Sequence, residues 1–218
     1  MNTTAVVDHR TRQRLLEAAI NLLSTDGLVS DLLTRAAQRA ACPLDRAHVF
    51  FSCNEDVILA LYARFAADLE ARVMDLPEAG VAERFRAAME AKFSILAPYR
   101  QALAALMDTM RDSKHELGVL HPQTEMIRAR VQGVFASVVH GASGRRLKNP
   151  DRLMRALYTA HLALVLRWCQ KGPDQAGALL KRACRMLDVA LPYLGLPVVS
   201  WAGGPEVVND SETPARRN

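Results

Sequence analysis

Residues 31–62, with the sequence DLLTRAAQRAACPLDRAHVFFSCNEDVILALY, contain the pattern that decides the fold. Small and apolar residues recur at helical spacing over 31–40, which predicts a short helix with one buried face. Pro43 suits the first turn of a second short helix over 44–50, because proline has no backbone N–H to donate. Two short helices joined by a tight turn predict a helix-turn-helix motif, in which the second helix is the recognition helix.

Further helices are predicted on both sides of this motif. Ser52 and Glu55 have the spacing of a capping box, so a long helix is expected to begin near Cys53. Before the motif, apolar periodicity predicts a helix over 11–25, and residues 1–10 are expected to form a flexible arm. The same periodicity predicts later helices over 81–96, 100–111, 123–140, 150–171 and 175–194.

The N-terminal region resembles the DNA-binding domain of TetR-type bacterial transcriptional repressors over about residues 10–62. The positions that carry the resemblance are Arg12, Gln13, Arg14, Leu15, Leu16, Glu17, Ala18, Ala19, Gly27, Ala36, Ala37, Ala40, Ala41, His48, Phe51, Glu55 and Val57. The chain departs from the family pattern at several positions. These are Ala41 for the turn glycine, Pro43 for a serine, Asp45 for a small residue, His48 for an aromatic phosphate contact and Asn54 for a lysine.

The resemblance implies an all-α protein with three parts. A three-helix helix-turn-helix DNA-binding domain would span 1–55, a helical ligand-binding and dimerisation domain 56–196, and a flexible tail 197–218. It implies a cytoplasmic homodimeric transcriptional regulator, usually a repressor, that binds a near-palindromic double-stranded DNA operator and releases it when a small hydrophobic effector binds. The alternative is a lipid- or isoprenoid-binding protein, because proteins of ubiquinone biosynthesis use the same fold without binding DNA.

The distribution of charge keeps that alternative open. The whole chain has a net charge of +5, but residues 1–62 contain six arginines and seven carboxylates, a net charge of −1. The basic excess lies downstream, mainly within 128–155. Because DNA affinity depends largely on neutralising phosphates, such an N-terminal domain is expected to bind DNA weakly for its class.

Six residues of the motif are candidate DNA contacts. They are Thr34, Arg35, Arg39, Leu44, Arg46 and His48. Arg46 and His48 could meet a base edge and a phosphate, since recognition helices present such residues near their N-termini. Both could equally be solvated surface residues. Asp45 would oppose contact with phosphate.

The larger domain contains aromatic residues and methionines that could surround a ligand. The candidates are Phe85, Met89, Phe93, Tyr99, Met107, Met110, Phe135, Tyr158, His161 and Trp168. Such residues are more often plain core, although methionine makes an adaptable cavity easy to build. His161 is the first polar candidate because it lies in the middle of an apolar helix.

The last two predicted helices carry more apolar positions than one packing face needs. These positions are Leu157, Leu164, Cys169, Leu180, Leu187 and Leu191. A four-helix interface between two chains would bury the remainder. The hairpin over 151–194 is therefore the predicted dimer interface.

Several functional classes are not indicated by the sequence. The chain is 50% apolar and 23% charged, which is typical of a globular protein, and it shows no signal-peptide or membrane-spanning pattern. No C-x-x-C pair or zinc-finger spacing is present, so no metal or other cofactor is expected. We also find no nucleophile with its base, no paired carboxylates and no phosphate loop, and we predict that the protein is not an enzyme. A redox-responsive regulator using Cys42 and Cys53 is a distant third possibility.

Overall fold

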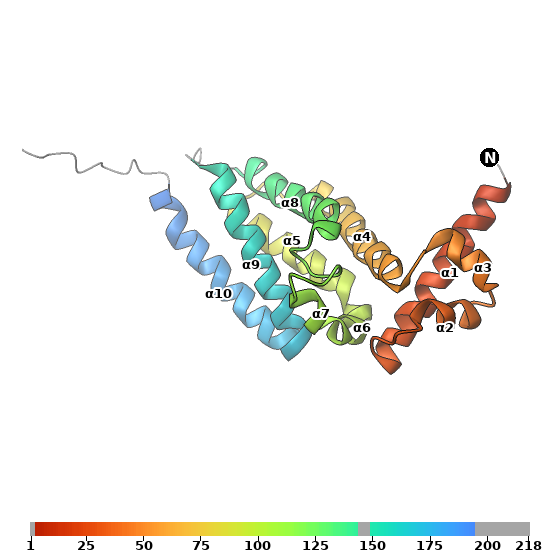
Figure 1. The fold of residues 1–218 in the computed structure, drawn as a ribbon. Helices are drawn as coiled ribbons and strands as arrows, with labels where there is room; N and C mark the ends of the chain where they lie inside the picture. Colours follow the sequence, from red (N-terminus) through yellow and green to blue (C-terminus); the bar gives the residue numbers. More distant parts are fainter. Residues whose placement is uncertain (1–2, 144–148, 195–218) are drawn as a thin grey trace, which may run out of the picture.

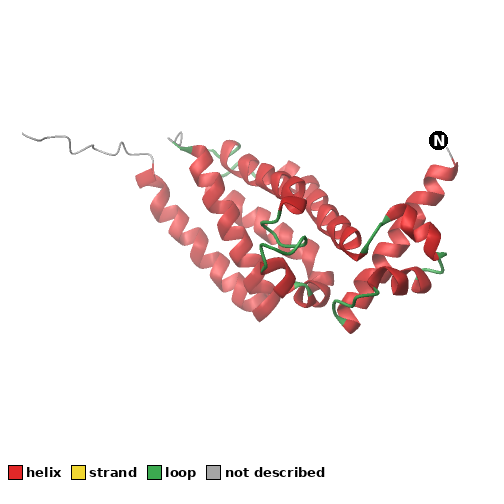
Figure 2. Cartoon of the chain, viewed as in Figure 1, coloured by secondary structure: helices red, strands yellow, loops and turns green. Residues whose placement is uncertain are grey.

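The computed structural model describes residues 3–143 and 149–194, and these residues form helices and loops without strands (Figures 1 and 2). The helices are α1 (Thr3–Asp26), α2 (Leu32–Arg39), α3 (Leu44–Phe50), α4 (Asn54–Arg72), α5 (Val81–Leu96), α6 (Arg100–Ala105), α7 (Met107–Arg111), α8 (Glu125–His140), α9 (Pro150–Lys171) and α10 (Pro173–Leu194), with short 3₁₀ turns at Val73–Asp75, Ala97–Tyr99 and Pro122–Thr124. The all-α fold with an N-terminal helix-turn-helix is therefore confirmed.

Helices α1, α2 and α3 form a small bundle at one end of the molecule, and the α9–α10 hairpin lies at the opposite end (Figure 1). Leu15, Leu22 and Leu32 are almost completely buried in the small bundle. Ala41, in the turn between α2 and α3, has a φ of +48°. This left-handed conformation is the one that glycine tolerates best, and Ala41 is the position at which the family resemblance leads one to expect glycine.

The start of α4 differs from the predicted capping box. The Asp56 carboxylate, rather than that of Glu55, accepts a hydrogen bond from the Ser52 N–H at 2.8 Å, and α4 begins at Asn54. The prediction of a Ser52–Glu55 capping box was wrong because Ser52 lies one residue before the N-cap position, which Cys53 occupies without a side-chain cap.

Asn54 instead fixes α4 to the helix-turn-helix. Its Oδ1 accepts a hydrogen bond from the Leu33 N–H at 2.8 Å, and its Nδ2 donates to the Ser30 carbonyl at 2.6 Å. Both partners belong to the segment that begins α2. Asn54, the first residue of α4, therefore connects α4 to the start of α2 by two hydrogen bonds.

Two other sequence predictions need correction. Helix α1 begins at Thr3, so the flexible arm predicted over 1–10 is wrong for residues 3–10, and residues 1–2 lie outside the described residues. No proline or glycine interrupts the segment, and Thr11 Oγ1 donates to the Val7 carbonyl within the continuous helix. The single helix predicted over 100–111 is divided at Leu106, whose N–H closes a tight turn onto the Leu103 carbonyl. The predicted tail over 197–218 lies outside the described residues.

A buried arginine joins two helices of the larger domain. Arg84 on α5 donates hydrogen bonds to the carbonyls of Pro77 at 2.7 Å, Ser137 at 3.0 Å and Val138 at 3.1 Å. The last two carbonyls belong to the final turn of α8, where the helix dipole favours a positive charge. Arg84 therefore connects α5, the turn before it and the C-terminus of α8.

The α9–α10 hairpin packs more completely within one chain than the sequence led us to expect. Leu157, Leu164, Cys169 and Leu180 are all buried inside the chain. These residues do face more than one neighbour, but the neighbours lie within the chain, because α9 packs against α8 as well as α10, and α10 packs against both α5 and α9. The expectation that a second chain is needed to bury these four residues was therefore wrong; Leu187 is partly buried, and the side chain of Leu191 lies outside the described residues. Over residues 173–190 of α10, the exposed large apolar side chains are Leu179, Met186 and Val189.

Candidate functional site

The first candidate site is the outer surface of α3. In this helix Ala47 is buried against the bundle, whereas Asp45, Arg46 and His48 are exposed. Leu44 and Val49 are also exposed, and Val49 retains 79% of its accessible surface. A short helix with one small buried residue and this many exposed side chains has the form of a recognition helix.

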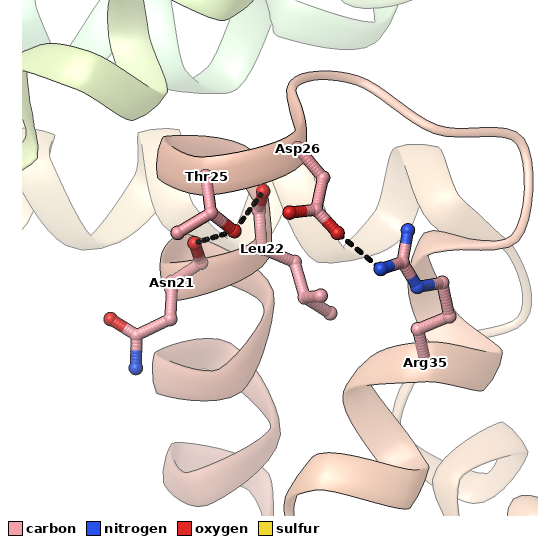
Figure 3. A network of polar contacts seen from close by, with 5 residues as sticks. All are labelled: Asn21, Leu22, Thr25, Asp26 and Arg35. Carbon is pink, nitrogen blue, oxygen red and sulfur yellow. Dashed lines mark hydrogen bonds and ion pairs between the residues drawn. The ribbon is translucent and has the colours of Figure 1, made fainter.

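Two of the candidate DNA contacts are engaged with carboxylates of α1. Arg46 Nη2 lies 2.8 Å from Asp8 Oδ1, and Arg35 on α2 pairs with Asp26 (Figure 3). Hydrogen bonds from Thr25 and Arg35 lower the pKa of Asp26 below its ordinary value. Both ion pairs are at the surface, so they reduce the positive potential without locking either arginine in place.

The other motif candidates lie around the same surface. Thr34 is half-buried on α2, whereas Arg39 is exposed at the end of that helix. Val49 was not among the DNA contacts predicted from the sequence, although it lies on the same predicted helix as Leu44, five residues further on. Exposed apolar side chains on a recognition helix can contact thymine methyl groups, and Val49 is suited to that role.

The second candidate site is a cavity of about 100 Å³ in the larger domain. Its walls come from α4, α5, α6, α7, α8, α9 and the segment over 119–124. The lining residues are Tyr62, Phe65, Lys92, Leu96, Leu103, Met110, Val119, Thr124, Ile127, Arg128, Val131, Tyr158, His161, Leu162 and Val165.

Three of the ten residues proposed for a ligand pocket meet around this cavity, namely Met110, Tyr158 and His161. The structure places the other seven elsewhere in the domain: Phe85, Met89, Phe93, Tyr99, Met107, Phe135 and Trp168. Most of these pack against another ring. Phe85 faces Phe135 at 5.9 Å between ring centroids, and Phe93 stacks on Trp168 at 5.7 Å.

Three buried polar groups face an otherwise apolar interior. Lys92 on α5 is 7% exposed, and burial lowers the pKa of its ammonium to about 8. His161 on α9 is 4% exposed, and burial together with the nearby Lys92 lowers its pKa to about 3, so the imidazole is neutral at physiological pH. Burial raises the pKa of Tyr62 on α4. Within the described residues, the Tyr62 hydroxyl and both His161 ring nitrogens have no hydrogen-bond partner.

Arg128 on α8 holds the segment over 112–124 against the cavity. Its Nη1 donates to the Val119 carbonyl at 3.1 Å and contacts Thr124 Oγ1 at 3.4 Å. Thr124 Oγ1 in turn lies 2.8 Å from the His121 carbonyl that accepts from it. Residues 119–124 thus form a wall of the cavity that is held by side-chain hydrogen bonds, by the backbone bond from the Val119 N–H to the Met110 carbonyl and by packing of Pro122–Thr124 against α8.

Sequence reasoning missed Lys92, Tyr62 and Arg128. A signal for Lys92 existed, because it lies three residues after Met89 and four before Leu96, on the apolar face of its helix. A charged residue at such a position is rarely left buried without a functional or structural partner.

Over residues 3–143 and 149–194, no three histidine, cysteine or carboxylate side chains gather closely enough to hold a metal ion. None of the helices in those ranges combines the length and apolar character needed to cross a membrane.

Comparison with known proteins gives a structural neighbour. No protein-family model and no curated protein sequence matches the chain. Among solved structures, the chain is similar to a TetR-family transcriptional regulator from Streptomyces coelicolor, with a TM-score of 0.57 and 17% sequence identity over 84% of this chain and 85% of that one. The likeness covers both the helix-turn-helix and the larger helical domain, and it shows that this chain has the TetR fold.

Proposed function

We propose that the protein is a DNA-binding transcriptional regulator, a repressor whose affinity for its operator is controlled by a small hydrophobic ligand in the larger domain. The observation that carries the proposal is that one helix, α4, serves both candidate sites. Its first residue, Asn54, is hydrogen-bonded to the segment that begins α2, and its Tyr62 and Phe65 line the cavity.

The geometry of α4 makes this coupling direct. Asn54 and Tyr62 are separated by about 12 Å along the helix at 1.5 Å per residue. A ligand that displaces Tyr62 therefore moves a rigid element whose end is fastened to Leu33 and Ser30. Helix α1 also contacts α4 and α6, which gives the small bundle a second connection to the larger domain.

A homodimer is part of the proposal. Leu179, Met186 and Val189 lie on the solvent side of α10, with Leu179 and Met186 seven residues apart and therefore on one face. Pairing of two α9–α10 hairpins would cover these residues in an isologous four-helix interface. The two α3 helices of such a dimer would enter successive major grooves about 34–36 Å apart, so the operator would be a near-palindrome.

The second candidate function is a lipid- or isoprenoid-binding protein that does not act on DNA. The observation that favours it is the engagement of Arg46 by Asp8 and of Arg35 by Asp26, which leaves the motif with little free positive charge. This function requires the cavity but not the exposed surface of α3.

The deciding experiment is selection of bound fragments from random duplex DNA at low salt, followed by binding assays with variants. Arg46→Ala should weaken operator binding by about 1–3 kcal/mol and relax preference at one position per half-site, if Arg46 pairs with a base. Asp8→Asn should strengthen binding, because it releases Arg46. Asp45→Lys should strengthen binding to all sequences and steepen the salt dependence. Arg111→Ala, an exposed arginine on α7, is the matched control and should change nothing.

Failure of the purified protein to retain any duplex at low salt would contradict the regulator. If Asp45→Lys then bound DNA no better than the wild type, the DNA-independent binder would become the preferred function.

A further inference from the structure

The cavity has an unbalanced charge. Lys92 and Arg128 both line it, and none of its lining residues in the described part of the chain is an aspartate or a glutamate. Asp68 on α4 is the carboxylate that favours protonation of Lys92, but it does not line the cavity and forms no ion pair with Lys92 within 4.0 Å. A charged group of a ligand bound here would therefore have Lys92 and Arg128, both cations, as its charged neighbours in the cavity wall.

The polar groups without partners are hydrogen-bond donors of the kind that an anion needs. The Tyr62 hydroxyl can donate one hydrogen bond, and a neutral His161 can donate one from either ring nitrogen. The Lys92 ammonium carries three donors. These side chains come from α4, α5 and α9 and line one cavity, and Lys92 is close enough to His161 to influence the pKa of its imidazole.

Burial makes these open groups unfavourable unless something pairs with them. A buried ammonium without a close counter-ion and a buried hydroxyl without an acceptor both lose hydration without replacement. A carboxylate supplies a negative charge and two acceptor oxygens at once. An uncharged ligand would leave the Lys92 charge uncompensated, and a cationic ligand would be repelled by Lys92 and Arg128.

The size of the cavity limits the rest of the ligand. Its volume of about 100 Å³ is smaller than the engineered cavity of about 150 Å³ that accepts benzene. The wall residues other than the polar groups are mainly aliphatic and aromatic. A compact apolar body smaller than an aromatic ring, such as a short aliphatic chain, is therefore what the site accommodates without expanding.

We propose that the cavity binds a monocarboxylate with a compact apolar body, and that Lys92, Tyr62 and His161 hold its carboxylate. This inference rests on the proposed ligand-binding role of the larger domain and specifies the chemical class of the ligand. Arg128 lies in the same wall and is occupied with carbonyls of the segment over 119–124, so it contributes positive potential rather than the main contact.

The test compares three probes of nearly equal size on the full-length protein by isothermal titration calorimetry: propionate, 1-propanol and propylammonium. Propionate should bind at least tenfold more tightly than 1-propanol, and propylammonium should not bind. Lys92→Met, which keeps the length of the side chain and removes its charge, should lose at least tenfold in propionate affinity and retain its affinity for 1-propanol. Tyr62→Phe should lose a smaller factor. Lys171→Met, at an exposed lysine of α9, is the control and should bind as the wild type does.

The outcomes separate this inference from the proposed function. Equal binding of propionate and 1-propanol to the wild type, which needs no variant, would overturn the carboxylate inference and leave a hydrophobic-ligand regulator standing. Unchanged propionate affinity in Lys92→Met would overturn it as well. Selective propionate binding by a protein that retains no duplex DNA would support the inference and refute the regulator. Absence of binding by all three probes would overturn the inference, while the DNA selection would still test the regulator.

Discussion

Replacement of Lys92 by methionine should stabilise the folded protein at neutral pH. Lys92 is 7% exposed on α5, and its ammonium has no ion-pair partner within 4.0 Å among the described residues. Asp68 on α4 favours the protonated form, but burial outweighs its influence on the pKa of Lys92. Methionine has a similar length and no charge to desolvate, so the variant removes an unfavourable group from the interior.

The expected gain in the free energy of unfolding follows from the pKa shift of Lys92. Burial lowers the pKa of Lys92 from 10.5 to about 8, and this shift corresponds to about 3 kcal/mol at roughly 1.4 kcal/mol per pKa unit. The unfolded chain binds the proton more tightly than the folded protein. Below the folded pKa both states are protonated and the full penalty is present, whereas between the two pKa values the stability from this group rises with pH.

The assay is urea unfolding of wild type and variant, at equal chain concentration, at pH 7 and pH 9.5. Lys92→Met should be more stable by about 3 kcal/mol at pH 7 and by about 1.4 kcal/mol at pH 9.5, because the wild type has by then lost much of its penalty. Lys171→Met, at an exposed position, should match the wild type at both pH values. A variant less stable than the wild type at pH 7, or a difference that does not shrink with pH, would refute the reasoning.

Three further changes test the fold. Ala41→Gly should raise the free energy of unfolding by about 0.5–1 kcal/mol, since glycine relieves the left-handed φ at some entropic cost; an unchanged urea midpoint would contradict this. Arg84→Met should lower it by about 2–4 kcal/mol in the same assay, because the carbonyls at the end of α8 lose a charged donor; a loss below 1 kcal/mol would show that water replaces the guanidinium. Met186→Glu combined with Val189→Glu should give stable monomers in sedimentation velocity, and a persistent dimer would place the interface elsewhere.

The helix-turn-helix could be predicted from the sequence because its signals are local. The apolar spacing over 31–40 identifies the buried face of a helix, and Pro43 marks the start of the next one. Helix α3 accordingly has the predicted bounds, Leu44–Phe50. The start of α1 could not be predicted in the same way, since its first ten residues contain neither a helix-breaking residue nor an apolar stripe. The sequence pattern of a polar helix is then the same as that of a polar flexible arm.

The cavity was predicted less well, and the reason is physical. Apolar periodicity shows that Phe85 and Phe135 face the interior, but it does not show whether the space beside them is empty, and the two rings fill it with each other. A large aromatic side chain is as suited to filling a core as to lining a pocket. A polar residue on an apolar helix face is more informative, because the interior must satisfy it. His161 met that criterion in the sequence, and Lys92 met it too.

The same polar groups give the cavity a means of acting on α4. Tyr62 belongs to α4, Lys92 to α5 and His161 to α9, so a headgroup that binds all three favours one spacing of these helices. A ligand changes a distant affinity only by its difference in binding free energy between two states, and a 100-fold change requires about 2.7 kcal/mol. Compensation of the Lys92 charge is of that order, since the penalty itself is about 3 kcal/mol. Because Asn54 hydrogen-bonds to Leu33 and Ser30, we propose that the helix spacing that best pairs Lys92 with a ligand also sets the position of α2 and α3.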